Sequence, residues 1–210
     1  AFYSSRRTKA EELVRRGAIG AVVVQTDDEE KQSPWTRFAG NWDRPSMRLR
    51  GEDGKGVDTF PQLRVSAMVS AAAADALLSA GGRHAAHLFQ ALRDGKLSAF
   101  DLPGTVSLRA HTQITPVESR NVVARIDGSD AAKKNEYVVF SAHLDHVGIG
   151  APVDGDAIYN GALDNALGIA VMLEAANRLA HDDKPTQGSL LFVAVTAEEK
   201  GLLGAEWFAQ

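Results

Sequence analysis

The chain has 210 residues, of which 44% are hydrophobic and 24% are charged, a balance typical of a globular protein with one large domain or two small ones. The formal net charge of -4 argues against a nucleic-acid partner, because nucleic-acid binding needs a basic surface. The absence of cysteine excludes disulfides and thiolate metal sites. No apolar run approaches the about 20 residues that span a bilayer, and the start of the chain has no apolar signal core.

The first half of the chain predicts a small α+β arrangement. Thr8 and Glu11 have the spacing of a capping box, so we expect a helix that begins near Thr8 and ends at Gly17. The segment AIGAVVV that follows is expected to be a buried strand, and the polar stretch 25–59 is expected to be a long loop. Three further elements follow in chain order: an extended segment over 60–69, a helix over 70–82 with Ser70 as its cap, and a helix over 84–96.

The second half predicts an α/β sheet, and we place a domain boundary between residues 1–104 and 105–210. Apolar runs alternate here with helical patterns, so the working end of the sheet should be the carboxyl ends of its strands. The expected elements are antiparallel strands over 105–115 and 120–128, a buried strand over 133–146, a helix that begins near Asn165 and is followed by a loop to 188, a buried strand over 189–199, and a helix that begins near 201.

Three polar clusters lie where this second half leaves a strand or enters a helix. In SAHLDH, His143 and Asp145 share one face of an extended strand, so the carboxylate can hold one ring nitrogen of the imidazole. In NGALDNALG, Asp164 lies at a helix N-terminus, where backbone N–H groups favour an anion. In TAEEKGLLG, Glu198 and Glu199 are adjacent at the end of a buried strand, where two negative charges repel each other.

Each cluster also has an ordinary structural interpretation: a histidine within a strand, a helix cap, and a solvated turn. Their occurrence in order at strand exits and a helix entry favours a divalent cation instead, zinc in particular, since imidazole and carboxylates suit such an ion. A cation would also offset the repulsion between the two glutamates. Because adjacent residues at a strand end face roughly opposite ways, Glu198 and Glu199 are expected to have different roles.

The same three motifs resemble, in order and spacing, those of the M28 family of co-catalytic zinc aminopeptidases over about residues 106–210. The first half is similar to the protease-associated (PA) domain often inserted in these enzymes, on the strength of the strand GAIGAVVV and the alanine-rich helix. The resemblance implies a partial mixed-sheet zinc-peptidase core over 105–210, preceded by a small PA-like α+β domain over 1–104. The function it implies is that of a metallopeptidase that hydrolyses N-terminal residues from peptide substrates.

The resemblance also implies a role for each residue of the clusters. His143, Asp164 and Glu199 would bind two zinc ions, with Asp164 bridging both and the peptide bond after Asp164 cis. Asp145 would orient the His143 imidazole. Glu198 would be the general base that takes a proton from a metal-bridging water and later protonates the departing amine.

Such a site needs two further ligands, a carboxylate and a histidine, after the Glu198-Glu199 motif, and the chain ends at Gln210. We therefore expect the chain to be a piece of a longer enzyme, catalytically weak and poor in zinc binding by itself. Among the other histidines, His146 is left open as a residue that lines the pocket. The rest are expected outside the site: His84 and His87 on a helix surface, His111 on a strand, and His181 in a solvated loop.

Several alternatives remain open at this point. The chain could belong to a carboxypeptidase of similar fold, to a glutaminyl cyclase relative that uses one zinc, or to a receptor-like homologue without catalysis. The clustered carboxylates argue against the last, since a site that binds no metal has no electrostatic reason to keep them. Peptidases with a PA-type insert are mostly exported, so the resemblance implies a periplasmic or secreted protein. Residue specificity and oligomeric state are not predicted.

Overall fold

The computed structural model describes residues 5–42 and 44–210, and the chain divides into two compact units. The first unit comprises residues 1–45 and 58–114, and the second comprises residues 46–57 and 115–210. Residues 1–4, which belong to the start where the sequence has no apolar signal core, lie outside the described residues. Within the part of the chain that is described, no helix has the length and hydropathy of a bilayer span.

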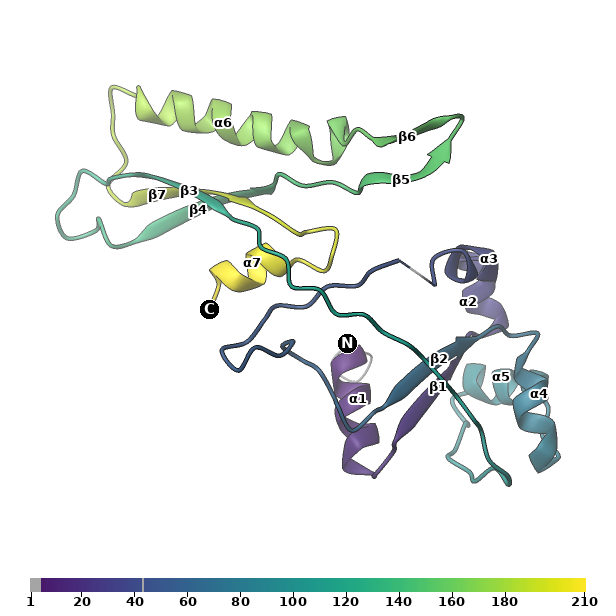
Figure 1. Ribbon diagram of the computed structural model, residues 1–210. Coiled ribbons are helices and arrows are strands. Elements are labelled where there is room, and N and C mark those ends of the chain that lie inside the picture. The colour runs from purple at the N-terminus through teal and green to yellow at the C-terminus, as the bar shows by residue number, and fades with distance from the viewer. Residues whose placement is uncertain (1–4, 43) are drawn as a thin grey trace. The chain divides into compact units, whose positions relative to one another are not determined.

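The first unit is built on two parallel strands that carry its helices (Figure 1). The strands pair in register from Gly20 with Val65 to Val24 with Val69. Ala74, Leu78 and Ala85 form its small buried core. In chain order its elements are α1 (Arg6–Arg15), β1 (Gly20–Val24), α2 (Asp27–Gln32), α3 (Trp35–Ala39), β2 (Val65–Val69), α4 (Ala74–Leu78), the 3-10 turn η2 (Ser79–Gly81) and α5 (Ala85–Arg93).

Several expectations for this unit need correction. The helix expected over 70–82 spans only Ala74–Leu78 and is followed by η2, and its N-cap is Ala73 and not Ser70. The first helix begins earlier than Thr8, because the Ser5 side chain accepts the Thr8 amide and acts as the N-cap. The stretch expected to be a long loop contains α2 and α3. A capping box starts α2: the Thr26 hydroxyl accepts the Glu29 amide, and the Glu29 carboxylate accepts the Thr26 amide. Reciprocal capping stabilises a helix too short and too polar to be recognised from an apolar pattern.

The second unit contains a mixed three-stranded sheet in the order β3–β7–β4, which is consistent with the mixed-sheet core that was predicted. The central strand β7 pairs antiparallel with β3 and parallel with β4. The connection from β4 to β7 passes through a hairpin and a helix, the crossover that parallel strands need. The elements are β3 (Val122–Ile126), β4 (Tyr137–His143), β5 (Gly148–Val153), β6 (Asp156–Tyr159), η3 (Ala162–Ala166), α6 (Leu167–Ala180), β7 (Ser189–Val195) and α7 (Leu203–Phe208).

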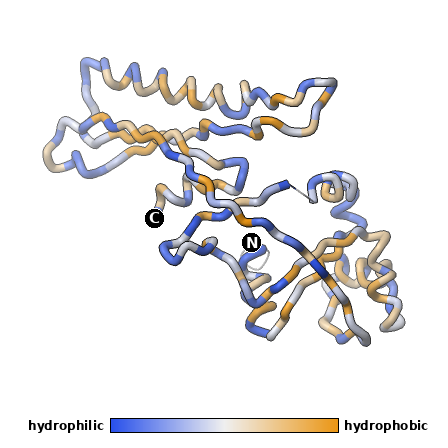
Figure 2. The backbone as a smooth tube through the Cα atoms, viewed as in Figure 1, coloured by the Kyte–Doolittle hydropathy of each residue, from blue (hydrophilic) through white to orange (hydrophobic). Residues whose placement is uncertain are grey.

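Helix α6 lies along one face of this sheet and closes the core of the unit (Figure 1). Met172 from the helix packs with Leu190 and Phe192 of β7, which are two residues apart and therefore share a face. The Phe140 and Phe192 rings of the neighbouring strands stack with centroids 5.0 Å apart. Figure 2 shows hydrophobic residues gathered along these strands. Strand β7 is thereby buried and packed against α6, and the loop that carries Glu198 and Glu199 follows directly from its carboxyl end.

Further differences concern the second half. The strand expected to be buried over 133–146 forms as β4, but Tyr137, Val138 and Val139 on it are exposed. No strand forms over residues 105–115, although their alternating pattern predicted one. Strands β5 and β6 form a hairpin between the first two clusters, which the sequence analysis did not predict. Gly148, Gly150 and Gly155 interrupt the apolar pattern of that hairpin, which explains why periodicity did not reveal it.

Candidate metal centre

The polar clusters meet because two parallel strands end side by side. His143, the last residue of β4, is the register partner of Val195, the last residue of β7. One further backbone hydrogen bond continues the pairing, from the Leu144 amide to the Val195 carbonyl at 2.9 Å. The segments that follow the two strands therefore leave from the same edge of the sheet, as predicted for an α/β arrangement.

The His143 ring is held through Nδ1 and directed at Asp164 through Nε2. Nδ1 lies 2.9 Å from the backbone carbonyl of Asp145 and must donate, because a carbonyl only accepts. Nε2 lies 3.0 Å from Oδ1 of Asp164. With the proton on Nδ1, a neutral ring presents the Nε2 lone pair to the site, which is how an imidazole binds a cation.

The electrostatic surroundings of His143 favour positive charge. Burial of the ring lowers the pKa of His143, but the Asp145 carbonyl and the neighbouring carboxylates, with Glu198 foremost, raise it more. The pKa of His143 therefore lies above its ordinary value. A place that stabilises a proton on an imidazole between carboxylates also stabilises a metal cation there.

Asp145 contacts the segments at the ends of both β4 and β7. Its carboxylate bonds to the segment after β7. Its oxygens accept the backbone amides of Glu198 at 3.1 Å and of Glu199 at 3.4 Å. The distance from Oδ1 to Nδ1 of His143 is 3.9 Å, beyond hydrogen-bond range. In this structure the imidazole is thus oriented by the backbone carbonyl of Asp145, while the side chain of Asp145 holds the loop that carries the two glutamates.

Asp164 lies in η3, immediately before α6, and its side chain is 63% exposed. The peptide bond between Asp164 and Asn165 is cis, as the resemblance implied. Asn165, and not Asp164, serves the helix end, because its Oδ1 accepts the Gly168 amide at 2.9 Å. The Asp164 carboxylate is consequently available at the sheet edge.

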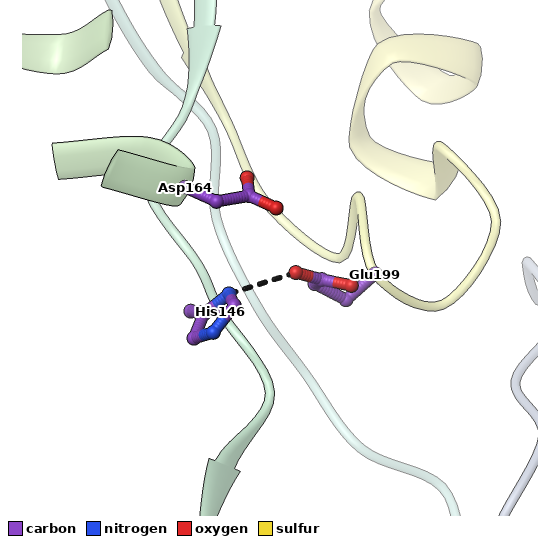
Figure 3. A group of neighbouring side chains, drawn as sticks. All are labelled: His146, Asp164 and Glu199. Carbon is purple, nitrogen blue, oxygen red and sulfur yellow. Dashed lines mark hydrogen bonds and ion pairs between the residues drawn. The ribbon is translucent and has the colours of Figure 1, made fainter. Parts of the chain in front are cut away.

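His146, Asp164 and Glu199 form a compact group of ligand-type side chains (Figure 3). One potential ligand atom from each lies within 4.8 Å of the other two. Figure 3 shows the Asp164 carboxylate above the His146–Glu199 pair, whose Nδ1 and Oε1 atoms are 2.8 Å apart. Two of these residues were predicted as ligands, and His146 was left open.

The two adjacent glutamates have different neighbours. After β7 the backbone turns through Ala197, which has a left-handed φ of 53°. Glu198 then lies on the His143 side, with Oε2 3.9 Å from Nε2, whereas Glu199 lies on the His146 side. The two glutamates were expected to have different roles. Their roles stay a prediction, but their side chains do have different neighbours.

Asn121 is a supporting residue that the sequence analysis missed. Its Oδ1 accepts the Thr196 amide at 3.1 Å and its Nδ2 donates to the Gly204 carbonyl at 2.7 Å, which closes the base of the glutamate loop. Gly204 must lack a side chain, since a Cβ there would lie 2.3 Å from the Thr196 carbonyl oxygen. The sequence offered no clear signal for this role, since Asn121 falls within the strand predicted over 120–128 and directly precedes the observed strand β3.

The remaining histidines take no part in the contacts described above. His84 and His87 are exposed at the start of α5, in the first unit. His111 lies in a stretch without a helix or strand, contrary to the strand expected there. His181 is exposed at the end of α6, where its Nδ1 lies 2.8 Å from the Asn177 carbonyl.

Comparison with known proteins points to one family. Residues 121–210 match the family described as Peptidase family M28. The chain is 39% identical over 97 residues to a "Probable zinc metalloprotease" of Pyrenophora teres f. teres, covering 46% of this chain and 20% of the relative. It is 38% identical over 95 residues to the "Alkaline phosphatase isozyme conversion protein" of Escherichia coli, covering 43% of this chain and 26% of the relative.

A second "Probable zinc metalloprotease", from Pyrenophora tritici-repentis, is 38% identical over 97 residues, covering 46% of this chain and 21% of the relative. The chain thus spans about a fifth to a quarter of the length of these curated relatives. No solved structure matches it significantly.

Proposed function

We propose that the protein acts as a zinc-dependent aminopeptidase on peptide substrates, because residues 121–210 match peptidase family M28. The observation that carries this proposal is the position of Asp164 between two sets of ligand-type atoms. Its carboxylate lies 3.0 Å from Nε2 of His143 and also belongs to the group formed with His146 and Glu199. One carboxylate shared between two neighbouring sets suits two cations bound side by side.

The side chains available at this edge fit zinc. Imidazole nitrogen and carboxylate oxygen are both zinc ligands, and both sets of ligand-type atoms lie at one edge of the sheet. His143 and Asp164 would hold one ion, and Asp164 and Glu199 would hold the other. Zinc, when bound, lowers the pKa of water and polarises the scissile carbonyl.

Glu198 is proposed as the general base. Its side chain is 32% exposed, so substrate and water can reach it, and its Oε2 lies 3.9 Å from Nε2 of His143. Its carboxylate takes a proton from the attacking water and later transfers it to the departing amine nitrogen. The loop that carries Glu198 is held at its amide by Asp145, which keeps the base in position between the steps.

Peptides with differently blocked ends test the proposal. The full-length protein is expected to release the first residue from a peptide with a free N-terminus and from the same peptide with an amidated C-terminus. An N-acetylated peptide should not be cleaved, a chelator should abolish turnover, and added zinc should restore it. Release of the last residue, or cyclisation of an N-terminal glutamine without hydrolysis, would overturn the aminopeptidase assignment in favour of a carboxypeptidase or a glutaminyl cyclase.

For the first half of the chain we propose a PA-like domain that shapes substrate access, and for the whole protein a periplasmic or secreted location. The parallel β1–β2 pair and its flanking helices support an α+β domain of this kind. Fractionation of the source cells tests the location: the protein should appear outside the cytoplasm. Its recovery only from the cytoplasmic fraction would contradict the proposal.

A further inference from the structure

His146 makes a contact that the proposed function does not use. It lies three positions beyond His143, in the segment between β4 and β5, and its Nδ1 is 2.8 Å from Oε1 of Glu199. Both side chains are only 23% exposed, so the pair is sheltered from water on most sides. A sheltered imidazole–carboxylate contact is stronger and better ordered than the same contact on an open surface.

The chain also leaves room for this ring. Gly161 has a left-handed φ of 65°, and a Cβ at that position would lie 2.8 Å from Cβ and 2.9 Å from Cγ of His146. The same Cβ would lie 2.9 Å from the carbonyl oxygen of Asp164. The absence of a side chain at Gly161 thus lets His146 approach the segment that carries Asp164, and it places the imidazole between that segment and Glu199.

We propose that His146 is a positioning residue that orients the Glu199 carboxylate toward a bound cation; this inference rests on the proposed function. A carboxylate only accepts hydrogen bonds, so Nδ1 of His146 donates and occupies Oε1 of Glu199. Oε2 is left for the cation. Carboxylate ligands are commonly fixed by such a hydrogen bond, and its removal typically lowers metal affinity.

The two imidazoles of the HLDH segment, His143 and His146, then have different roles at the site. His143 is fixed by a backbone carbonyl and directs Nε2 at Asp164, so it faces the cation itself. His146 directs its donor at Glu199, so it acts through that residue. A direct bond from His146 to the cation is the competing assignment, and the test must separate the two.

Two substitutions separate these assignments in the full-length protein. In His146→Asn the amide nitrogen can replace Nδ1 as donor to Glu199, whereas His146→Leu offers no donor. Zinc affinity, measured by competition with a chromophoric chelator, should fall about 10- to 100-fold in His146→Leu. In His146→Asn it should stay near that of the unaltered protein. His181→Leu, which removes an exposed imidazole from the end of α6, is the matched control and should bind zinc normally.

The visible spectrum of bound cobalt(II) provides a second readout, because it reports on the atoms that bind the metal and not on the stability of the protein. The visible spectrum of the cobalt-loaded protein should be unchanged by His146→Asn, because no nitrogen ligand is lost. Equal weakening in the asparagine and leucine variants, with an altered cobalt spectrum, would identify His146 as a ligand and overturn the positioning role. Unchanged zinc affinity in His146→Leu would also overturn the positioning role of His146. If the unaltered protein had no zinc affinity, the proposed function would be overturned as well.

Nitrogen-15 NMR of the metal-free protein tests the contact by itself. The His146 ring should carry its proton on Nδ1, and its signals should shift in Glu199→Gln but not in Glu206→Gln, which alters an exposed carboxylate of α7. If the His146 ring signals did not shift in Glu199→Gln, the contact on which the inference depends would be refuted. This result does not depend on zinc, so it distinguishes a wrong contact from a wrong function.

Discussion

The backbone amide of Glu198 donates a hydrogen bond to the Asp145 carboxylate at 3.1 Å, which joins the segment after β4 to the segment after β7. The Glu199 amide reaches the same carboxylate at 3.4 Å. Two adjacent acidic side chains are thus anchored through their backbone, and their carboxylates remain available to the site. The position of the glutamates depends on an aspartate that is distant in the sequence and adjacent in the fold.

Replacement of Asp145 tests this anchoring. Asp145→Ala removes the acceptor for both amides, so the glutamate loop should loosen and zinc affinity should fall about 10- to 100-fold. Asp182→Ala is a matched control, because Asp182 also accepts a nearby amide, that of Lys184, but in an exposed turn. Isothermal titration with zinc compares the three proteins. Equal affinities in all of them would show that Asp145 does not organise the site.

The two glutamates should differ in what their loss removes. Glu198→Gln keeps the shape of the side chain but not the base, so turnover should fall about 10²- to 10⁴-fold while zinc content stays unchanged. Glu199→Ala removes a ligand, so zinc content should fall by one ion. Atomic absorption and peptide turnover, measured on the same preparations, check both statements. If the two variants retained identical zinc, the proposed division of roles would be wrong.

Asn121 should contribute to stability through the loop that it closes. Asn121→Ala removes hydrogen bonds to the Thr196 amide and the Gly204 carbonyl, and should lower the free energy of unfolding by about 1–3 kcal/mol. Asn160→Ala is the control, since Asn160 is exposed and donates only a long 3.3 Å bond to Ile158; its effect should stay within about 0.5 kcal/mol. Urea unfolding measures both, and a loss no larger than the control's would contradict the role of Asn121.

In the first unit, the capping box of α2 should make a predictable contribution to stability. Thr26→Ala removes the acceptor for the Glu29 amide and should destabilise the unit by about 1 kcal/mol. Thr26→Ser keeps a hydroxyl in the same place and should restore most of that loss. Hydrogen exchange of the α2 amides provides the measurement. Faster exchange in the serine variant than in the alanine variant would be inconsistent with capping.

Local patterns were sufficient where the chain's own periodicity decides the structure. The apolar run of β7 and the helical pattern of α6 identified a buried strand and its covering helix, because both elements bury a face that the sequence displays directly. The spacing of His143, Asp164 and Glu199 led to the prediction of a metal site at strand ends, and the structure brings Asp164 and Glu199 together there with His146. Alternation misled over residues 105–115, since it indicates a strand only when a partner is present to pair with it.

The sequence by itself predicted a set of ligand-type residues and predicted that they leave one edge of a sheet. Tertiary structure alone decided their contacts: the Asp145 carboxylate holds the Glu198 amide and not the His143 ring, Asn121 closes the glutamate loop, and His146 meets Glu199. The physical reason is that strand periodicity specifies which face a side chain shares, whereas hydrogen bonds depend on separations of a fraction of an ångström. Those separations arise from the pairing of distant segments, which no local pattern encodes.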